Sequence, residues 1–161
     1  MSLPLFIAEP AGYSGAVNAE GAGRVCAQIA FVLADGLPGA NCAEDDVLAA
    51  TAGFAPALLA LDAAGNACWE VGTERVSPKD VDIASVEVVM WRNGEVVAQG
   101  SASVDPVRAV TELTREAAAA DIRIAAAEVV FSGPCAAVEA APGDEFIAEF
   151  AGLGSVSLLL S

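Results

Sequence analysis

The sequence predicts an α+β fold that is mainly β, a mixed and mostly antiparallel β-roll with two helices at its edge. Three observations favour this fold. About seven short runs are rich in β-branched, aromatic and other apolar residues. Only two segments carry helix-start signals, and they do not alternate with the strands as a parallel sheet would require. Asn93-Gly94 separates two of the runs, and Asn-Gly between strands strongly favours a hairpin.

The predicted strands are either alternating or uniformly apolar, as expected for strands with one or two buried faces. They are expected over residues 24–33, 56–62, 85–91, 95–101, 128–132, 145–150 and 155–160. Residues 1–23 begin the chain with several glycines, so we expect an irregular segment there, and residues 63–80 are expected to be loop. A chain of 161 residues can bury one sizeable core, so we expect a single domain over residues 1–161.

Both predicted helices begin with capping residues. Asn41 can cap the first helix, with Glu44 completing a capping-box pattern, and this helix is expected to end near Gly53. Asp105 can cap the second helix, with Pro106 at its first position. The apolar stripe that should face the core consists of Val107, Val110, Leu113 and Ala117.

Composition excludes several classes of function. The net charge of −15, with only seven basic residues, argues against a partner nucleic acid. The absence of histidine excludes Ser-His-Asp and Cys-His catalysis within the chain, and His-ligated zinc. No run approaches the roughly 20 apolar residues that span a membrane, and no basic leader precedes an apolar run. We therefore expect a soluble, cytoplasmic protein.

The remaining polar clusters have ordinary structural explanations. The four cysteines, which lack C-x-x-C spacing, are expected to be reduced structural thiols: Cys26, Cys42, Cys68 and Cys135. The acidic run from Glu44 to Asp46 is better explained by the positive end of a helix dipole than by a metal site.

Short motifs in a fixed order along about four-fifths of the chain resemble a known family. They are Ile29-Ala-Phe-Val-Leu, Leu37-Pro-Gly, Asp46-Val-Leu-Ala-Ala-Thr, Pro56-Ala-Leu, Asn93-Gly-Glu-Val-Val, Pro106-Val-Arg-Ala-Val, Val130-Phe-Ser-Gly, Pro142-Gly-Asp and Gly152-Leu-Gly-Ser-Val-Ser. This order is similar to the C-terminal catalytic domain of the fumarylacetoacetate hydrolase superfamily, in its 2-keto-4-pentenoate hydratase and 4-oxalocrotonate decarboxylase branch. The resemblance implies that fold, a homodimer, and lyase chemistry on 2-oxo or dienoic acids.

The resemblance also implies a magnesium or manganese site built from three glutamates, a Glu-x-Glu pair before Ile-Ala-Phe and a third on the next strand. This sequence has Cys26 and Gln28 in place of the pair and Leu59 in place of the third. A thiol, an amide and an alkyl group lack the oxygen-rich negative charge that such cations require. The family metal is therefore expected to be lost. The family's N-terminal lysine and the loop after the third ligand strand also have no clear counterpart.

The pocket candidates are the three substituted positions and two polar residues near them: Cys26, Gln28, Leu59, Asp62 and Ser132. Asp62 is either a strand-end residue that hydrogen-bonds the backbone or pairs with an arginine, or a residue that keeps a catalytic or ligand-binding role. Ser132 is either a turn residue or a hydroxyl contact to substrate. No catalytic residue is assigned.

Three functional hypotheses stay open. In the first, the chain is a degenerate homologue, a pseudoenzyme that binds a small organic acid or assembles with a partner. In the second, it is a hydratase-like or decarboxylase-like enzyme with altered chemistry. In the third, it has a purely structural role and completes an active family member in trans.

Overall fold

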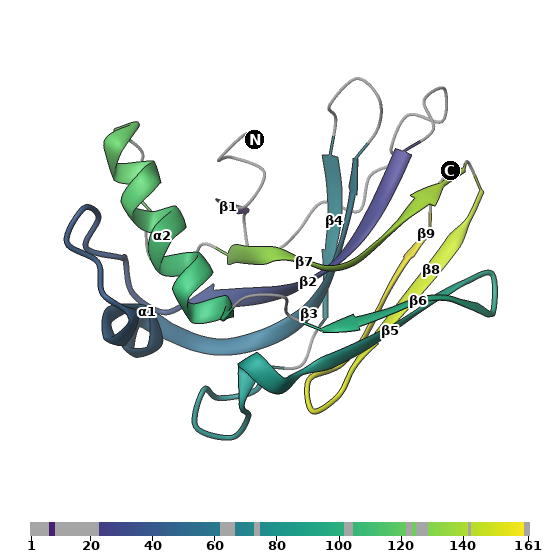
Figure 1. The fold of residues 1–161 in the computed structure, drawn as a ribbon, viewed down its shortest axis with the longest axis horizontal. Helices are drawn as coiled ribbons and strands as arrows, with labels where there is room; N and C mark the ends of the chain where they lie inside the picture. The colour runs from purple at the N-terminus through teal and green to yellow at the C-terminus, as the bar shows by residue number, and fades with distance from the viewer. Residues whose placement is uncertain are drawn as a thin grey trace.

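The computed structural model places strands and helices in a two-sheet arrangement (Figure 1). It describes residues 7–8, 23–61, 67–72, 75–101, 105–121, 124, 129–141 and 143–159. The strands are β1 Ile7–Ala8, β2 Gly23–Leu33, β3 Thr51–Leu61, β4 Ala67–Val71, β5 Glu87–Arg92, β6 Glu95–Ser101, β7 Val129–Ala140, β8 Glu145–Phe150 and β9 Gly154–Leu159. The helices are α1 Glu44–Ala50 and α2 Pro106–Ala119, with a 3₁₀ turn, η2, at Ile83–Ser85.

Two sheets form the body of the fold. The five-stranded sheet has the order β1-β7-β2-β3-β4, and the four-stranded sheet has the order β6-β5-β8-β9. Every pairing among the described strands is antiparallel. The predicted mainly β, mostly antiparallel fold with two helices is therefore confirmed.

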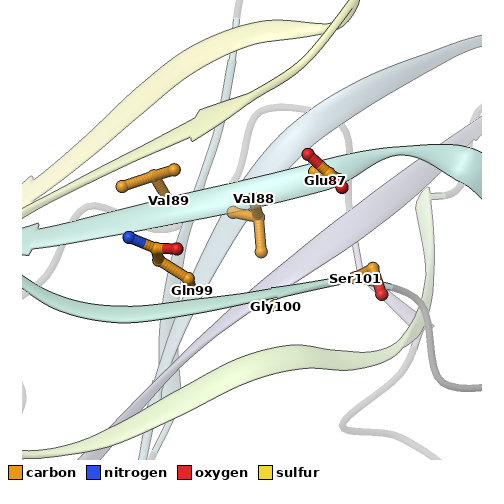
Figure 2. A pocket seen from close by; sticks show the side chains of 6 residues that line it. All are labelled: Glu87, Val88, Val89, Gln99, Gly100 and Ser101. Carbon is orange, nitrogen blue, oxygen red and sulfur yellow. The ribbon is translucent and has the colours of Figure 1, made fainter.

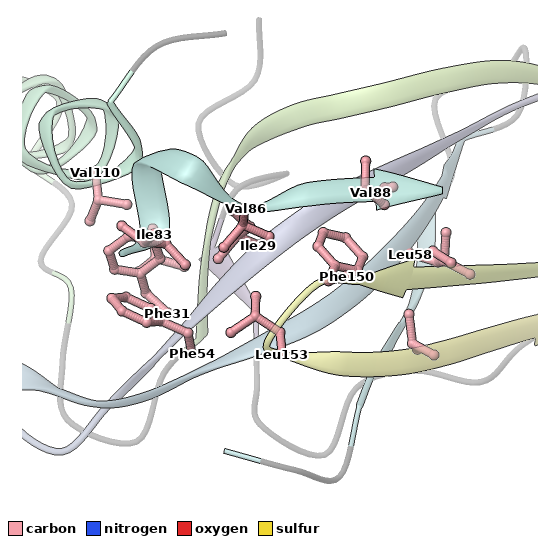
Figure 3. Close-up of a cluster of buried hydrophobic side chains, with 14 of the residues drawn as sticks. Ile29, Phe31, Phe54, Leu58, Ile83, Val86, Val88, Val110, Phe150 and Leu153 are labelled. Atoms are coloured by element: carbon pink, nitrogen blue, oxygen red, sulfur yellow. The ribbon is translucent and has the colours of Figure 1, made fainter. Parts of the chain in front are cut away.

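The main core lies between the two sheets (Figure 3). One face of β2 points inward, because the alternating residues Val25, Ala27, Ile29 and Phe31 all lie in this core. Phe31 meets Phe54 of β3 edge to face, with ring centroids 4.8 Å apart and planes at 70°. Phe150 of the four-stranded sheet belongs to the same cluster, so the core joins the two sheets.

The predicted hairpin and second helix are both confirmed. Asn93 and Gly94 take positive φ values of 51° and 86°, the left-handed pair that a tight two-residue hairpin needs. In α2 the Asp105 side chain accepts a 3.0 Å hydrogen bond from the Val107 N–H, and Pro106 opens the helix. All four residues of the predicted apolar stripe are buried.

The first helix differs from its prediction at both ends. Its N-cap is Ala43 rather than Asn41, and Asp46 rather than Glu44 accepts a 2.9 Å hydrogen bond from the Ala43 N–H. The helix ends at Ala50, before the predicted end, because Thr51 already has the extended ψ of 117° with which β3 begins. The local capping signal identified the helix but placed its start two residues too early.

Other boundaries also differ from the predictions. The expected loop over 63–80 contains β4, which forms because it can pair with the edge of β3. The expected irregular segment 1–23 contains β1, which pairs with β7. Strands β3 and β7 are longer than predicted, since both continue alongside β2 for most of its length. The described part of the chain holds no bilayer-crossing helix, because neither α1 nor α2 combines the necessary length and apolar character.

Candidate functional site

Three of the five candidate residues lie together on the five-stranded sheet. Cys26 and Gln28 are two residues apart on β2, so their side chains leave the same face of the strand. Leu59 is the direct cross-strand partner of Cys26 on β3. This face is opposite to the one that carries Ile29 and Phe31 into the main core, because alternate residues of a strand point to opposite sides.

All three side chains are buried. Their relative exposures are 8% for Cys26, 2% for Gln28 and 2% for Leu59. Trp69 of β4 pairs with Leu59, and its ring meets that of Phe131 of β7 at a centroid distance of 6.4 Å. These positions thus lie on a largely apolar sheet face.

The apolar residues of this face form a second cluster, which we call the outer-sheet cluster. Its buried members are Ala30, Ala55, Ala57, Leu59, Val129 and Phe131, with Val32, Trp69 and Val71 packed against them. A face covered by alkyl and aromatic groups has a low local polarity, so an ion placed there loses much of its hydration.

The donor groups at the candidate site do not fit a hard divalent cation. Burial raises the pKa of the Cys26 thiol, an effect only partly opposed by the positive charge of Arg24, so this thiol stays neutral at pH 7. Gln28 offers an amide, and Leu59 offers no donor at all. Magnesium and manganese favour several anionic oxygen ligands. Among the residues that the structure describes, no group of three His, Cys, Asp or Glu side chains could hold a metal ion.

The structure does not describe the side chains of the other two candidate residues. Asp62 lies outside the described residues. Ser132 lies on β7, two residues before Pro134, which is aligned with Gln28 on β2. The backbone therefore brings position 132 near the substituted positions, and its hydroxyl contact stays a prediction.

A hollow of about 280 Å³ lies elsewhere, where the Glu87 end of β5 runs beside the Ser101 end of β6 (Figure 2). It is lined by Glu87, Val88, Val89, Gln99, Gly100 and Ser101. Its volume is below the roughly 300–1,000 Å³ typical of small-molecule sites, and its one carboxylate would repel an organic acid. Sequence reasoning did not anticipate this hollow, because strand periodicity gives no signal for one.

No family model matches the chain. It is 32% identical over 167 residues to 2-hydroxyhexa-2,4-dienoate hydratase of Comamonas testosteroni, covering 89% of this chain and 63% of that protein. It is 29% identical over 160 residues to 2-oxo-hept-4-ene-1,7-dioate hydratase of Escherichia coli, covering 83% and 60%.

Solved structures agree with this similarity. The 4-oxalocrotonate decarboxylase from Pseudomonas putida G7, complexed with magnesium and adipate, superposes with a TM-score of 0.79 at 29% identity, over 87% of this chain and 61% of that one. A fumarylacetoacetate hydrolase from Exiguobacterium antarcticum shares the fold with a TM-score of 0.74 at 16% identity, over 92% and 61%. The chain spans about three-fifths of the length of these relatives.

Proposed function

We propose that this chain, which belongs to the 2-keto-4-pentenoate hydratase and 4-oxalocrotonate decarboxylase branch of the fumarylacetoacetate hydrolase superfamily, is a degenerate member of that branch. It keeps the scaffold, lacks metal-dependent catalysis, and binds a small organic acid or acts as an assembly partner. The chain spans about three-fifths of the length of these relatives, so whatever is said here of its activity is a proposal.

The proposal rests on one pair of residues. Cys26 and Leu59 are cross-strand partners at two positions where the family resemblance implies carboxylates, and both are buried. A neutral thiol beside an alkyl group offers no negative charge to a dication. Moving such an ion from water to this face would cost more hydration energy than these groups return. The residues therefore favour packing over metal-assisted chemistry.

The substrate class comes from the relatives. Their names indicate unsaturated hydroxy or oxo acids, so a small organic acid is the ligand class we assign to this chain if it keeps a ligand. Without a metal to polarise the 2-oxo group, binding would not lead to hydration or decarboxylation by the family route.

Calorimetric titration with Mg²⁺ and Mn²⁺ tests the metal part of the proposal. We expect no saturable heat from this chain, and no metal-dependent turnover of 2-hydroxypentadienoate. The 4-oxalocrotonate decarboxylase from Pseudomonas putida G7, which is known in complex with magnesium, serves as the positive control for metal binding. A 2-keto-4-pentenoate hydratase serves as the positive control for turnover. Saturable binding of either metal, or turnover that chelation abolishes, would overturn the proposal.

A residual enzyme is the alternative, favoured by the catalytic names of the relatives. Turnover that persists with a chelator would support it. The assembly role is tested by mixing the chain with a full-length hydratase or decarboxylase and measuring the complex by sedimentation velocity. A stable hetero-complex supports that role, and a homodimer that does not bind the relative counts against it.

A further inference from the structure

The outer face of the four-stranded sheet carries an exposed apolar row. Trp91 of β5 pairs with Val96 of β6 on one side and with Ile147 of β8 on the other. Cross-strand partners share a face, so these three side chains lie in line across three strands. The row faces away from the main core, because the alternate residues Met90 and Ala148 are the buried ones.

The row is partly open to solvent, with Trp91 half-buried at its centre. Val96 is 50% exposed and Ile147 is 38% exposed. Leu159 of β9, at 63%, pairs with Glu145, which lies two residues from Ile147 on the same face. We call Val96, Trp91, Ile147 and Leu159 the apolar row. Exposed apolar side chains that form a contiguous patch usually mark a contact surface.

Carboxylates flank the apolar row. Glu145 and Glu149 are the exposed residues on either side of Ile147 in the alternation of β8. Glu87 is exposed on the same face of β5, two positions before Val89, which pairs with Glu149. None of these three carboxylates has an ion-pair partner among the residues that the structure describes.

The basic residue that follows Trp91 on β5 does not neutralise this face. Arg92 donates a 3.4 Å hydrogen bond from Nη1 to the carbonyl oxygen of Glu139 on β7, so it reaches toward the five-stranded sheet. The face is thus an apolar row with an acidic rim, on a chain whose net charge is −15. A second copy would bring the same rim and the same net charge, so self-association through this face is electrostatically disfavoured.

The geometry points to a docking surface for a protein segment that has an apolar centre flanked by lysine or arginine. The apolar centre covers Trp91 and Ile147, and the basic flanks reach Glu87, Glu145 and Glu149. Attraction between complementary charges speeds the encounter and sets the register, while burial of the row supplies the affinity. This inference concerns the four-stranded sheet, so it does not depend on the substituted metal positions of the five-stranded sheet.

A defined peptide tests the surface on the full chain. The probe is a synthetic peptide with Val-Phe-Val at its centre and a lysine pair at each end, titrated by calorimetry. Ile147→Ser is compared with Leu48→Ser, because Leu48 of α1 is an equally exposed apolar residue, at 38%. We expect Ile147→Ser to weaken peptide binding about tenfold and Leu48→Ser to weaken it less than about twofold.

A second pair of variants separates the rim from the overall charge. Glu145→Gln with Glu149→Gln removes two rim charges, and Glu112→Gln with Glu116→Gln removes two exposed charges from α2. The first pair is expected to weaken binding about tenfold at low salt, and the second pair less than about twofold. Thermal unfolding of each variant confirms that it is folded.

Three results would overturn the inference. Equal losses in the α2 and sheet variants would indicate general attraction to an acidic chain. Equal binding of a peptide whose centre is Ser-Ser-Ser would show that the apolar row is not used. Self-association in sedimentation velocity that Ile147→Ser abolishes would assign the face to a second copy instead.

Discussion

The side chain of Asn93 donates a 3.0 Å hydrogen bond from Nδ2 to Oδ1 of Asp144, across 51 positions of sequence. Asn93 Oδ1 in turn accepts a 2.9 Å bond from the Glu145 N–H, and Asp144 Oδ2 accepts one of 2.9 Å from the Ala141 N–H. The hairpin turn between β5 and β6 is therefore tied to the turn that leads into β8. These bonds, first that from Ala141 and then that from Asn93, hold the pKa of Asp144 below its ordinary value.

Replacing Asp144 with alanine is expected to lower the free energy of unfolding by about 1 kcal/mol at neutral pH, because hydrogen bonds to both turns are lost. A carboxyl group whose pKa is lower in the folded than in the unfolded state stabilises the fold fully at pH values above its unfolded-state pKa. It loses this contribution as the pH falls through its folded-state pKa. The difference between wild type and Asp144→Ala should therefore shrink below pH 3.8, the ordinary value for this carboxyl. Urea unfolding over a pH series measures it.

Asp35→Ala is the matched control for this prediction. Asp35 is an exposed loop aspartate whose side chain makes no hydrogen bond within the part of the chain that the structure describes. Its replacement should change stability little. If the two variants lose stability equally, the contact between the turns contributes nothing measurable.

The sequence predicted one half of this contact and not the other. Asn93-Gly94 was identified as a hairpin because the left-handed backbone of both residues is a local property. The Pro-Gly-Asp turn at Asp144 was visible too, but nothing local says that it pairs with Asn93. The same limit explains β4, which forms only because β3 offers it an edge.

Gly100 is expected to be intolerant of any side chain. A Cβ at this position of β6 would overlap the backbone carbonyl oxygen of Cys135 on β7, so one sheet must move away from the other. We expect Gly100→Ala to cost about 2 kcal/mol or more in stability, measured by urea unfolding. Gly94→Ala has open space but a φ of +86°, and should cost only about 1 kcal/mol. A Gly100→Ala variant as stable as Gly94→Ala would contradict the close approach.

The thiols are expected to react slowly in the folded chain. Burial raises the pKa of Cys135 to about 11, and it raises the pKa of Cys26 and Cys42 as well. Only the thiolate reacts, so labelling at pH 7 by a disulfide reagent should be slow and should accelerate as the pH rises. The measurement uses Cys68→Ser, with the urea-unfolded chain as the fast control. Rapid labelling of the folded variant at pH 7 would contradict the burial of Cys26 and Cys42 and the partial burial of Cys135.

The candidate site shows how far family resemblance reaches. The resemblance selected positions 26, 28 and 59, and the structure places Cys26 and Leu59 directly opposite each other. Cys26 and Gln28 were expected to share a face because residues two apart on a strand point to the same side. The sequence indicated a buried strand around Leu59, but it did not indicate what covers this face, because the partner Trp69 lies in a segment expected to be loop.

Restoring the three carboxylates is the sharpest test of the degenerate site. The variant Cys26→Glu, Gln28→Glu, Leu59→Glu places three acidic groups on a buried apolar face, so we expect it to lose several kcal/mol of stability without metal. Mn²⁺ should recover part of this loss, because a ligand that binds only the folded state stabilises it. Thermal unfolding with and without Mn²⁺ measures both effects.

Leu59→Gln is the control for this variant, because it adds a polar group without charge. Its Tm should fall, and Mn²⁺ should not restore it; the wild-type Tm should likewise be unchanged by Mn²⁺. We expect the restored variant to gain metal affinity without full turnover of 2-hydroxypentadienoate, because the lysine and the loop of active members have no clear counterpart in this sequence. A triple variant that Mn²⁺ leaves unaffected would mean that the three side chains do not converge on a common point. Full turnover would mean that the chain lacks only its metal ligands.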